Sequence, residues 1–305
     1  MKKQHSSSKK KEIHFPYAIR SFLGYLEGTQ KSAHTIKNYQ LDLLSFQKYL
    51  EQTEGTELTF SLSLLENLVQ NDLTRYHDFL MQKGLKSNTR RRKLLTIQKF
   101  LHYLVKRNKL TDELPRKILT PIKVERVPYT VDFGQLLAHI QSLPQATRLD
   151  QRNRLLLWTL AETGCLVNEI SLLKFFHFSE TGRYFQLEIP GKAKRTLSIS
   201  KELYLAVIEF QIQEKKDSHT SIFLGFNKFG SLGGPISPRG VELLVKQFSH
   251  QFGLGEFTPR TFRHSRVLAW FKENLPREEI QKRLGLKTAY AFRTFEPLLN
   301  HLHLL

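Results

Sequence analysis

Apolar residues recur every three or four positions over most of residues 15–107, with a polar break at residues 51–57, which predicts a set of α-helices. A first apolar stripe follows the helix-capping candidates of residues 32–35 and comprises Ile36, Tyr39, Leu43, Phe46 and Leu50. A second stripe follows the capping candidates of residues 87–89 and comprises Leu94, Ile97, Phe100, Leu101, Leu104 and Val105. A shorter helix is expected over residues 73–82, with Gly84 as its stop. Together these segments predict a helical domain over residues 14–110.

The second half of the chain combines helices with a β-hairpin. Residues 184–189 and 195–199 alternate apolar and polar side chains with period two, around a basic turn. Helical periodicity is found over residues 131–143, 151–162, 201–215, 237–252, 260–272 and 277–284. Three prolines interrupt residues 111–130, which indicates a linker. The sequence therefore predicts a basic tail (1–13), a helical domain (14–110), a linker (111–130) and a mixed α+β domain (131–305), in a mainly α protein.

The charge balance restricts the partners of this chain. It has 47 Lys and Arg against 28 Asp and Glu, a formal net charge of +19, which attracts nucleic acid or an anionic membrane surface. The sequence has no run of about 18 apolar residues, so no membrane span is expected. The basic N-terminus lacks the apolar segment of a secretory signal. The one cysteine, Cys165, fits a reducing cytoplasm and is expected as an inert core residue rather than a reactive thiol. No Cys/His spacing indicates zinc, and we expect no cofactor.

The helix predicted from residue 87 to about residue 106 carries, with its flanks, the densest positive charge. This cluster comprises Lys83, Lys86, Arg90, Arg91, Arg92, Lys93, Lys99, Lys106, Arg107 and Lys109, with no Asp or Glu between them. A solvated helix usually mixes signs to gain ion pairs four residues apart, whereas a cluster of one sign suits a phosphate backbone. We predict that Lys86 and residues 90–93 contact DNA; a merely basic surface is the alternative.

Five short motifs follow one another in the order and at the spacing of a known family. They are Ser-Ala-His-Thr-Ile-Lys-Asn-Tyr at 32–39, Thr-Gly-Cys-Leu-Val-Asn-Glu-Ile-Ser-Leu-Leu at 163–173, Gly-Lys-Ala-Lys-Arg at 191–195, Thr-Pro-Arg-Thr-Phe-Arg-His at 258–264 and Ile-Gln-Lys-Arg-Leu-Gly-Leu at 280–286. Together they resemble the motifs of the tyrosine recombinase, or phage integrase, family of the Xer type. The resemblance spans residues 14–300. It implies a SAM-like core-binding domain, then a catalytic-type domain, both acting on duplex DNA without metal or nucleotide.

The family surrounds one scissile phosphate with two arginines, a hairpin lysine, two histidines (or a histidine and a tryptophan) and a nucleophilic tyrosine. The resemblance assigns Lys192 as the hairpin lysine and Arg263 as the second arginine, with His264 beside it. The changed positions are Leu166 for the first arginine, Arg260 for the first histidine, Leu286 for the second histidine or tryptophan, and Phe295 for the tyrosine. Lys192, Arg260, Arg263 and His264 are therefore candidates for a residual phosphate-binding cleft. Lys194 and Arg195 of the hairpin are further candidates for DNA contact.

Three functions remain open on the sequence. The first is a catalytically impaired protein of this family that binds duplex DNA, as a homo-oligomer or beside an active recombinase, in the cytoplasm on the nucleoid. The second is an active site-specific recombinase, in chromosome partition or DNA integration, with Tyr290 as a displaced nucleophile. The third is a basic module for RNA or protein assembly. The apolar C-terminal residues 298–305 are expected to pack in cis or on a neighbouring protomer.

Overall fold

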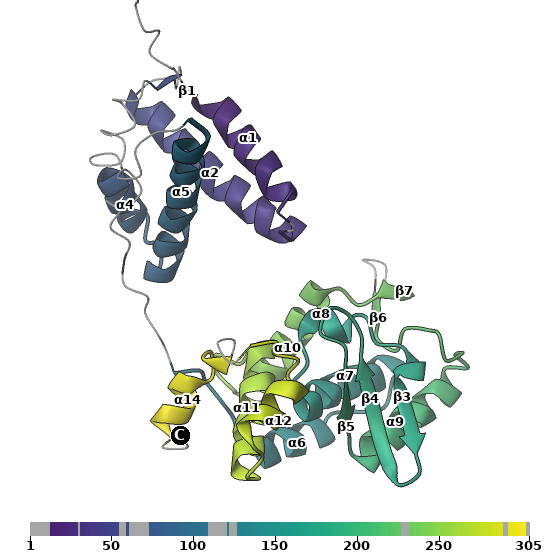
Figure 1. Cartoon of the computed structure of the whole chain (residues 1–305). Helices are drawn as coiled ribbons and strands as arrows, with labels where there is room; N and C mark the ends of the chain where they lie inside the picture. Colours follow the sequence, from purple (N-terminus) through teal and green to yellow (C-terminus); the bar gives the residue numbers. More distant parts are fainter. Residues whose placement is uncertain are drawn as a thin grey trace, which may run out of the picture. The chain divides into compact units, whose positions relative to one another are not determined.

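The computed structural model describes residues 13–29, 31–54, 59–60, 73–108, 121, 127–226, 232–288 and 292–302. Three features of interest lie outside these residues: nearly all of the basic tail, most of the predicted linker, and Tyr290. The chain divides into two compact units, Met1–Glu125 (unit 1) and Arg126–Leu305 (unit 2). Both are shown in Figure 1.

Unit 1 is a bundle of helices with one short strand pair (Figure 1). Strand β1 (Ile13–His14) pairs antiparallel with β2 (Thr59–Phe60). The helices are α1 (Phe15–Glu27), α2 (Ala33–Glu54), α4 (Leu73–Gln82) and α5 (Ser87–Asn108). The imidazole of His14 accepts a hydrogen bond from the Tyr17 backbone N–H and so caps the start of α1.

The predicted apolar stripes form the core of unit 1. Leu43, Phe46 and Leu50 of α2 are fully buried, and so are Ile97 and Phe100 of α5. Each stripe lies on one face of its helix because residues three and four apart in a helix share a face. Helix α1 closes the bundle against α2 and α5. Its buried residues are Phe15, Ala18, Ile19, Phe22 and Leu26.

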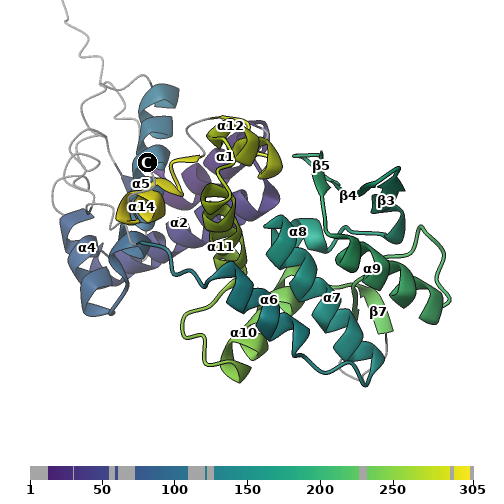
Figure 2. The ribbon, with the colours of Figure 1, turned by 90° about the horizontal axis from the view of Figure 1, so that it is seen from below.

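Unit 2 is built around α7 (Arg148–Thr163), which contacts α6 (Phe133–Gln141), α9 (Lys201–Gln213) and α11 (Pro259–Lys272). Figure 2 shows α7 between α6 and α9. A reciprocal capping box of Thr147 and Asp150 starts α7, and Gly164, with φ of 58°, ends it. The other described helices are α8 (Val167–Ile170), the 3-10 turn Phe175–His177, α10 (Pro238–Gln251), α12 (Arg277–Arg283) and α14 (Glu296–His301).

The predicted hairpin belongs to a three-stranded antiparallel sheet, ordered β3 (Phe178–Thr181), β4 (Tyr184–Ile189), β5 (Arg195–Ser198). The register places Leu187 opposite both Phe178 and Leu197, so their side chains share the buried face. A separate pair joins β6 (Leu224–Phe226) and β7 (Leu232–Pro235). The predicted mainly helical fold with a small sheet is confirmed, although β3 and the β6–β7 pair were not predicted.

The described end of the chain packs in cis. Leu298 and Leu299 of α14 are buried. Leu299 lies in a cluster with Val267 and Trp270 of α11, Ile280 of α12, Leu284, Phe292 and Phe295. Among the described residues, no helix has the length and apolar character needed to cross a membrane.

Candidate functional site

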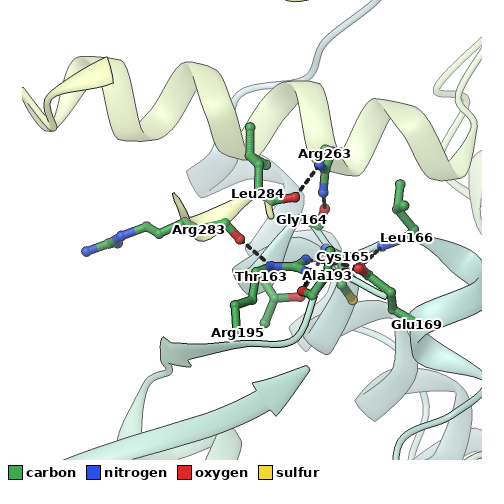
Figure 3. A network of polar contacts seen from close by, with 10 residues as sticks. All are labelled: Thr163, Gly164, Cys165, Leu166, Glu169, Ala193, Arg195, Arg263, Arg283 and Leu284. Carbon is green, nitrogen blue, oxygen red and sulfur yellow. Dashed lines mark hydrogen bonds and ion pairs between the residues drawn. The ribbon is translucent and has the colours of Figure 1, made fainter. Parts of the chain in front are cut away.

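The motif of residues 163–173 meets the β-hairpin through a buried ion pair (Figure 3). Both terminal nitrogens of Arg195 donate to the Glu169 carboxylate, at 2.6 and 3.0 Å, and both side chains are about nine-tenths buried. The second oxygen of Glu169 also accepts the Leu166 backbone N–H at 2.7 Å, which caps α8. Arg195 Nε donates to the Arg283 carbonyl at 2.6 Å. Arg195, a predicted DNA contact, thus joins α8, the hairpin and α12 inside the protein.

Arg263 lies beside this ion pair and is also buried, with 8% of its surface exposed. Its terminal nitrogens donate to the carbonyls of Gly164, at 2.7 Å, and Leu284, at 2.8 Å (Figure 3). Burial, and then the charge of Arg195, lower the pKa of Arg263 to about 10, so it stays protonated at neutral pH. A guanidinium has five N–H donors, and two of them hold α11 against the ends of α7 and α12.

The hairpin approaches α12 so closely that only glycine fits at position 285. Gly285 has φ of +66°, and a Cβ there would lie 2.9 Å from the Ala193 Cβ and 3.0 Å from Arg195 Nη1. A side chain at position 285 would therefore be strained by its backbone and blocked by the hairpin.

The aromatic ring at position 295 occupies the interior of unit 2. Phe295 is 3% exposed and meets the His264 ring edge to face, with ring centroids 5.4 Å apart. Burial, followed by the charges of Arg260 and Arg263, lowers the pKa of His264 to about 4. The structure therefore brings Arg260, Arg263, His264 and Phe295 together, with His264 neutral at pH 7.

The two leucines of the candidate site lie in different surroundings. Leu166 is 47% exposed, whereas Leu286 is half-buried against the cluster that contains Phe295. Neither side chain can donate a hydrogen bond to a phosphate oxygen.

Cys165, next to Leu166, is buried, and burial raises the pKa of its thiol to about 12, so it is not a reactive thiol at neutral pH.

The exposed cations of the site are Lys192 and Arg260. Lys192 follows Gly191, whose φ of +100° forms the hairpin turn. Lys194 pairs with Glu188 at 3.0 Å, with 66% of the lysine side chain exposed. These groups can meet an anion from solvent without breaking the buried network of Glu169 and Arg195.

In unit 1 the predicted basic cluster surrounds one buried acid. Asp42 of α2 is 1% exposed; it accepts hydrogen bonds from Arg92 and from Thr96, and its other oxygen lies 3.4 Å from Lys93 Nζ. Its carboxylate thus partly neutralises two cations of α5 that are remote in sequence. Arg92 nevertheless keeps 49% of its side chain exposed.

The remaining cations of the cluster differ in their contacts. Arg90 donates to the Leu85 carbonyl at 2.7 Å, and Arg91 donates to the Pro121 carbonyl at 3.1 Å. Lys86 is exposed. An open groove of about 440 Å³ runs between α2 and α5. Its lining includes Thr35, Asn38, Asp42, Asn88, Arg91, Arg92 and Lys99.

Comparison with protein families decides the relationship. The model described as "Phage integrase family" matches residues 131–290, and the model described as "Phage integrase, N-terminal SAM-like domain" matches residues 19–108. The chain belongs to the phage integrase family. The resemblance inferred from the five motifs is thereby confirmed.

Relatives found by sequence are named tyrosine recombinases, and solved structures share the fold. The chain is 26% identical over 284 residues to tyrosine recombinase XerC of Chlamydia trachomatis serovar L2, covering 87% of this chain and 88% of the relative. A solved XerH recombinase bound to its difH substrate, in a pre-cleavage complex, shares the fold with a TM-score of 0.65 and 20% identity, covering 91% and 79% of the two chains. A tyrosine-to-phenylalanine variant of the Tn1549 transposon integrase, in complex with transposon right-end DNA, has a TM-score of 0.64 and 14% identity, covering 95% and 100%.

Two structural features of this family member were missed from the sequence: the buried Asp42, and the pairing of Glu169 with Arg195. An acidic residue on the apolar face of α2 was the only available signal for Asp42, because its partners lie about 50 residues away. No group of three or more His, Cys, Asp or Glu that could hold a metal ion occurs within the described ranges.

Proposed function

We propose that this protein binds duplex DNA as a member of the phage integrase family and does not cleave it. The observation that carries the proposal is that residue 295, which the resemblance assigns as the nucleophilic tyrosine, is a buried phenylalanine. A phenyl ring has no oxygen to attack phosphorus, so the covalent route through this position is closed. Tyr290, which lies five residues earlier, is outside the described residues.

The surroundings of Phe295 add to the chemical deficit. Leu166 and Leu286 replace groups that would stabilise charge on the phosphate oxygens, and each such donor is worth about 10²–10³ in rate. His264, with its pKa lowered to about 4, is neutral at pH 7 and contributes no positive charge. Arg263 and Arg195 bond to the protein's own carbonyls and carboxylate. These contacts stabilise the fold. They leave the two arginines fewer free N–H donors to stabilise negative charge on a phosphate in the transition state.

Binding of duplex DNA is supported by charge and by the fold. The net charge of +19 favours a polyanion; Arg92 lines the groove between α2 and α5, and Lys86 is exposed just before α5. The XerH and Tn1549 structures are complexes with DNA, the latter with a tyrosine replaced by phenylalanine. In the proposal, Lys86 and residues 90–93 contact phosphates, and Lys192, Lys194 and Arg260 supply further positive charge. The partner on DNA is a second copy or an active recombinase.

Covalent trapping tests the proposal. Duplexes that bind the purified full chain are selected from a random pool, nicked beside the bound site so that religation fails, and incubated with protein. Wild type and Phe295→Tyr are expected to give no adduct that survives denaturation. The fourfold variant Leu166→Arg, Arg260→His, Leu286→His, Phe295→Tyr restores the family's residue types and is expected to give one.

Two results would contradict the proposal. A wild-type adduct that disappears in Tyr290→Phe would show an active recombinase with a displaced nucleophile. Selection that enriches no duplex, with binding that structured RNA competes away equally well, would show that the charge alone attracts nucleic acid.

A further inference from the structure

A second groove of unit 1, of about 420 Å³, lies between α1, α5 and the start of α2. Its lining combines aromatic and basic side chains. It comprises Phe22, Tyr25, Leu26, Lys31, Tyr39, Lys99, His102, Tyr103, Lys106 and Arg107. No Asp or Glu is among the described residues that line it. We call this surface the tyrosine groove.

Two rings of the tyrosine groove are held by hydrogen bonds. The hydroxyl of Tyr103 lies 2.8 Å from the Ser21 hydroxyl and accepts a bond from Arg107 at 2.5 Å. The hydroxyl of Tyr39 accepts a bond from Lys99 Nζ at 2.7 Å. These rings are therefore fixed in place before any ligand arrives, which lowers the entropic cost of binding.

The ring of Tyr25 differs because it is open to solvent. Tyr25 is 52% exposed, and its ring centroid lies 5.2 Å from that of Tyr103, with 34° between the planes. Tyr103 therefore supports one side of Tyr25, and a planar ligand can stack on the exposed part of the ring. Tyr103 in turn packs on Phe22 of the core, with centroids 5.2 Å apart.

Cations lie directly beside these rings. Lys99 Nζ is 5.3 Å from the centroid of the Tyr39 ring, and the Arg107 guanidinium carbon is 5.9 Å from that of Tyr103. Lys31 and Lys106 add two further charges to the lining. An ammonium has three N–H donors and a guanidinium five, so each cation can keep its bond to the tyrosine hydroxyl and still donate to a phosphate oxygen.

We propose that the tyrosine groove binds unpaired nucleotides of single-stranded DNA. A single strand presents one phosphate and one exposed aromatic face per nucleotide, matching a groove that holds both cations and rings. A duplex hides its base faces in the stack and would leave Tyr25 unused. An acidic peptide would pair with the lysines but would not need the rings. The proposal extends the proposed function from duplex to single-stranded DNA and does not depend on it.

The test compares binding of a fluorescent oligo(dT) strand and a duplex of equal length to the full chain, by fluorescence anisotropy at fixed salt. Tyr25→Ala is expected to weaken oligo(dT) binding about tenfold through the loss of one stacked base. Tyr25→Phe keeps the ring and is expected to bind like wild type. Tyr17→Ala is the matched control, because Tyr17 is an exposed tyrosine of the same helix and does not line the groove. Duplex affinity is expected to stay unchanged in all three variants.

Equal loss of duplex and oligo(dT) affinity in Tyr25→Ala would overturn the proposal, and so would unchanged oligo(dT) affinity. Photo-crosslinking with 5-iododeoxyuridine strands gives a second measurement, expected to map to Tyr25 or Tyr103. A crosslink confined to unit 2 would contradict it. Wild-type protein that binds oligo(dT) but no duplex would refute the proposed function and leave this inference standing.

Discussion

The arginines of the two units have different tasks. In unit 2, the Arg195 side chain and the whole of Arg263 are both more than nine-tenths buried. Arg195 bonds to Glu169 and to a main-chain carbonyl, and Arg263 bonds to two main-chain carbonyls. In unit 1, Arg92 shares a buried carboxylate with Lys93 yet keeps about half of its side chain in solvent. In unit 2, Arg195 and Arg263 thus act as structural supports, whereas Arg92 of unit 1 remains partly available to a ligand.

This difference separates the family fold from catalytic activity, which membership of the family alone does not distinguish. Three residues of the unit 2 motifs, Glu169, Arg195 and Arg263, hold α7, α8, the hairpin and α12 together. These contacts stabilise the fold whether or not the protein is catalytic. Substitution of Arg263 therefore tests the fold before it tests any ligand, and DNA contacts are better examined with exposed residues of unit 1.

The largest expected effect concerns the buried pair of unit 2. Glu169→Ala leaves Arg195 buried beside Arg263 without its carboxylate and removes the cap of α8. We expect the free energy of unfolding to fall by about 3–5 kcal/mol, measured by urea denaturation. Glu188→Ala, which breaks the exposed pair with Lys194, is the matched control and is expected to cost at most about 1 kcal/mol. Similar losses in the two variants would refute a structural role for the buried pair.

A somewhat smaller effect is expected on the free energy of unfolding when the pH falls and His264 is protonated in the unfolded chain. Its pKa of about 4 in the folded protein lies below the value of about 6.5 for an unfolded histidine. The unfolded chain therefore binds more protons between these values. The stabilisation is present above about pH 6.5 and is lost as the pH falls toward 4, by about 3 kcal/mol in all.

The His264→Gln variant isolates this contribution from that of the carboxylates. Its unfolding free energy is expected to fall less steeply than that of wild type between about pH 6.5 and 4, in urea titrations at each pH. The control is His250→Gln, a change at an exposed histidine of α10, and it should follow wild type. Parallel curves for wild type and His264→Gln would show that His264 is protonated at the same pH in both states.

The smallest expected effect is on duplex affinity in unit 1. Lys83→Ala with Lys86→Ala removes two exposed cations before α5 and is expected to lower the salt slope of duplex binding by about 2. The measurement is log affinity against log salt. Lys201→Ala with Lys215→Ala removes two exposed cations from the α9 region of unit 2 and controls for net charge. Equal slopes in the two double variants would remove the distinction between the units.

The helices could be predicted because each carries its own signal. The apolar stripe from Ile36 to Leu50 is visible in its own segment, whichever element it packs against. Helix α4 begins and ends at the predicted residues, Leu73 and Gln82. Strand β3 was missed because residues 178–181 have one buried and three exposed side chains, too few to show an alternation. Its place in the sheet comes from its register with β4.

The contacts of the candidate-site residues could not be predicted from the sequence. The motifs locate Arg195 and Arg263, and yet nothing local indicates that Arg195 meets Glu169, 26 residues away, or that Arg263 meets the carbonyl of Gly164, 99 residues away. Such partners are set by how α7, the hairpin and α11 pack. The same limit applies to Asp42, whose charge partners belong to another helix.

The contact between Gly285 and the hairpin has a consequence for how this protein can diverge. With Ala193 Cβ and Arg195 Nη1 at about 3 Å from the place of a missing methyl group, no residue larger than glycine fits at 285 while the hairpin stays in position. A larger residue at 285 therefore has to be accommodated by a movement of residues 193–195. Any lineage that enlarges residue 285 has to shift the strand end that carries Lys192, and with it the spacing between Lys192 and the rest of the site.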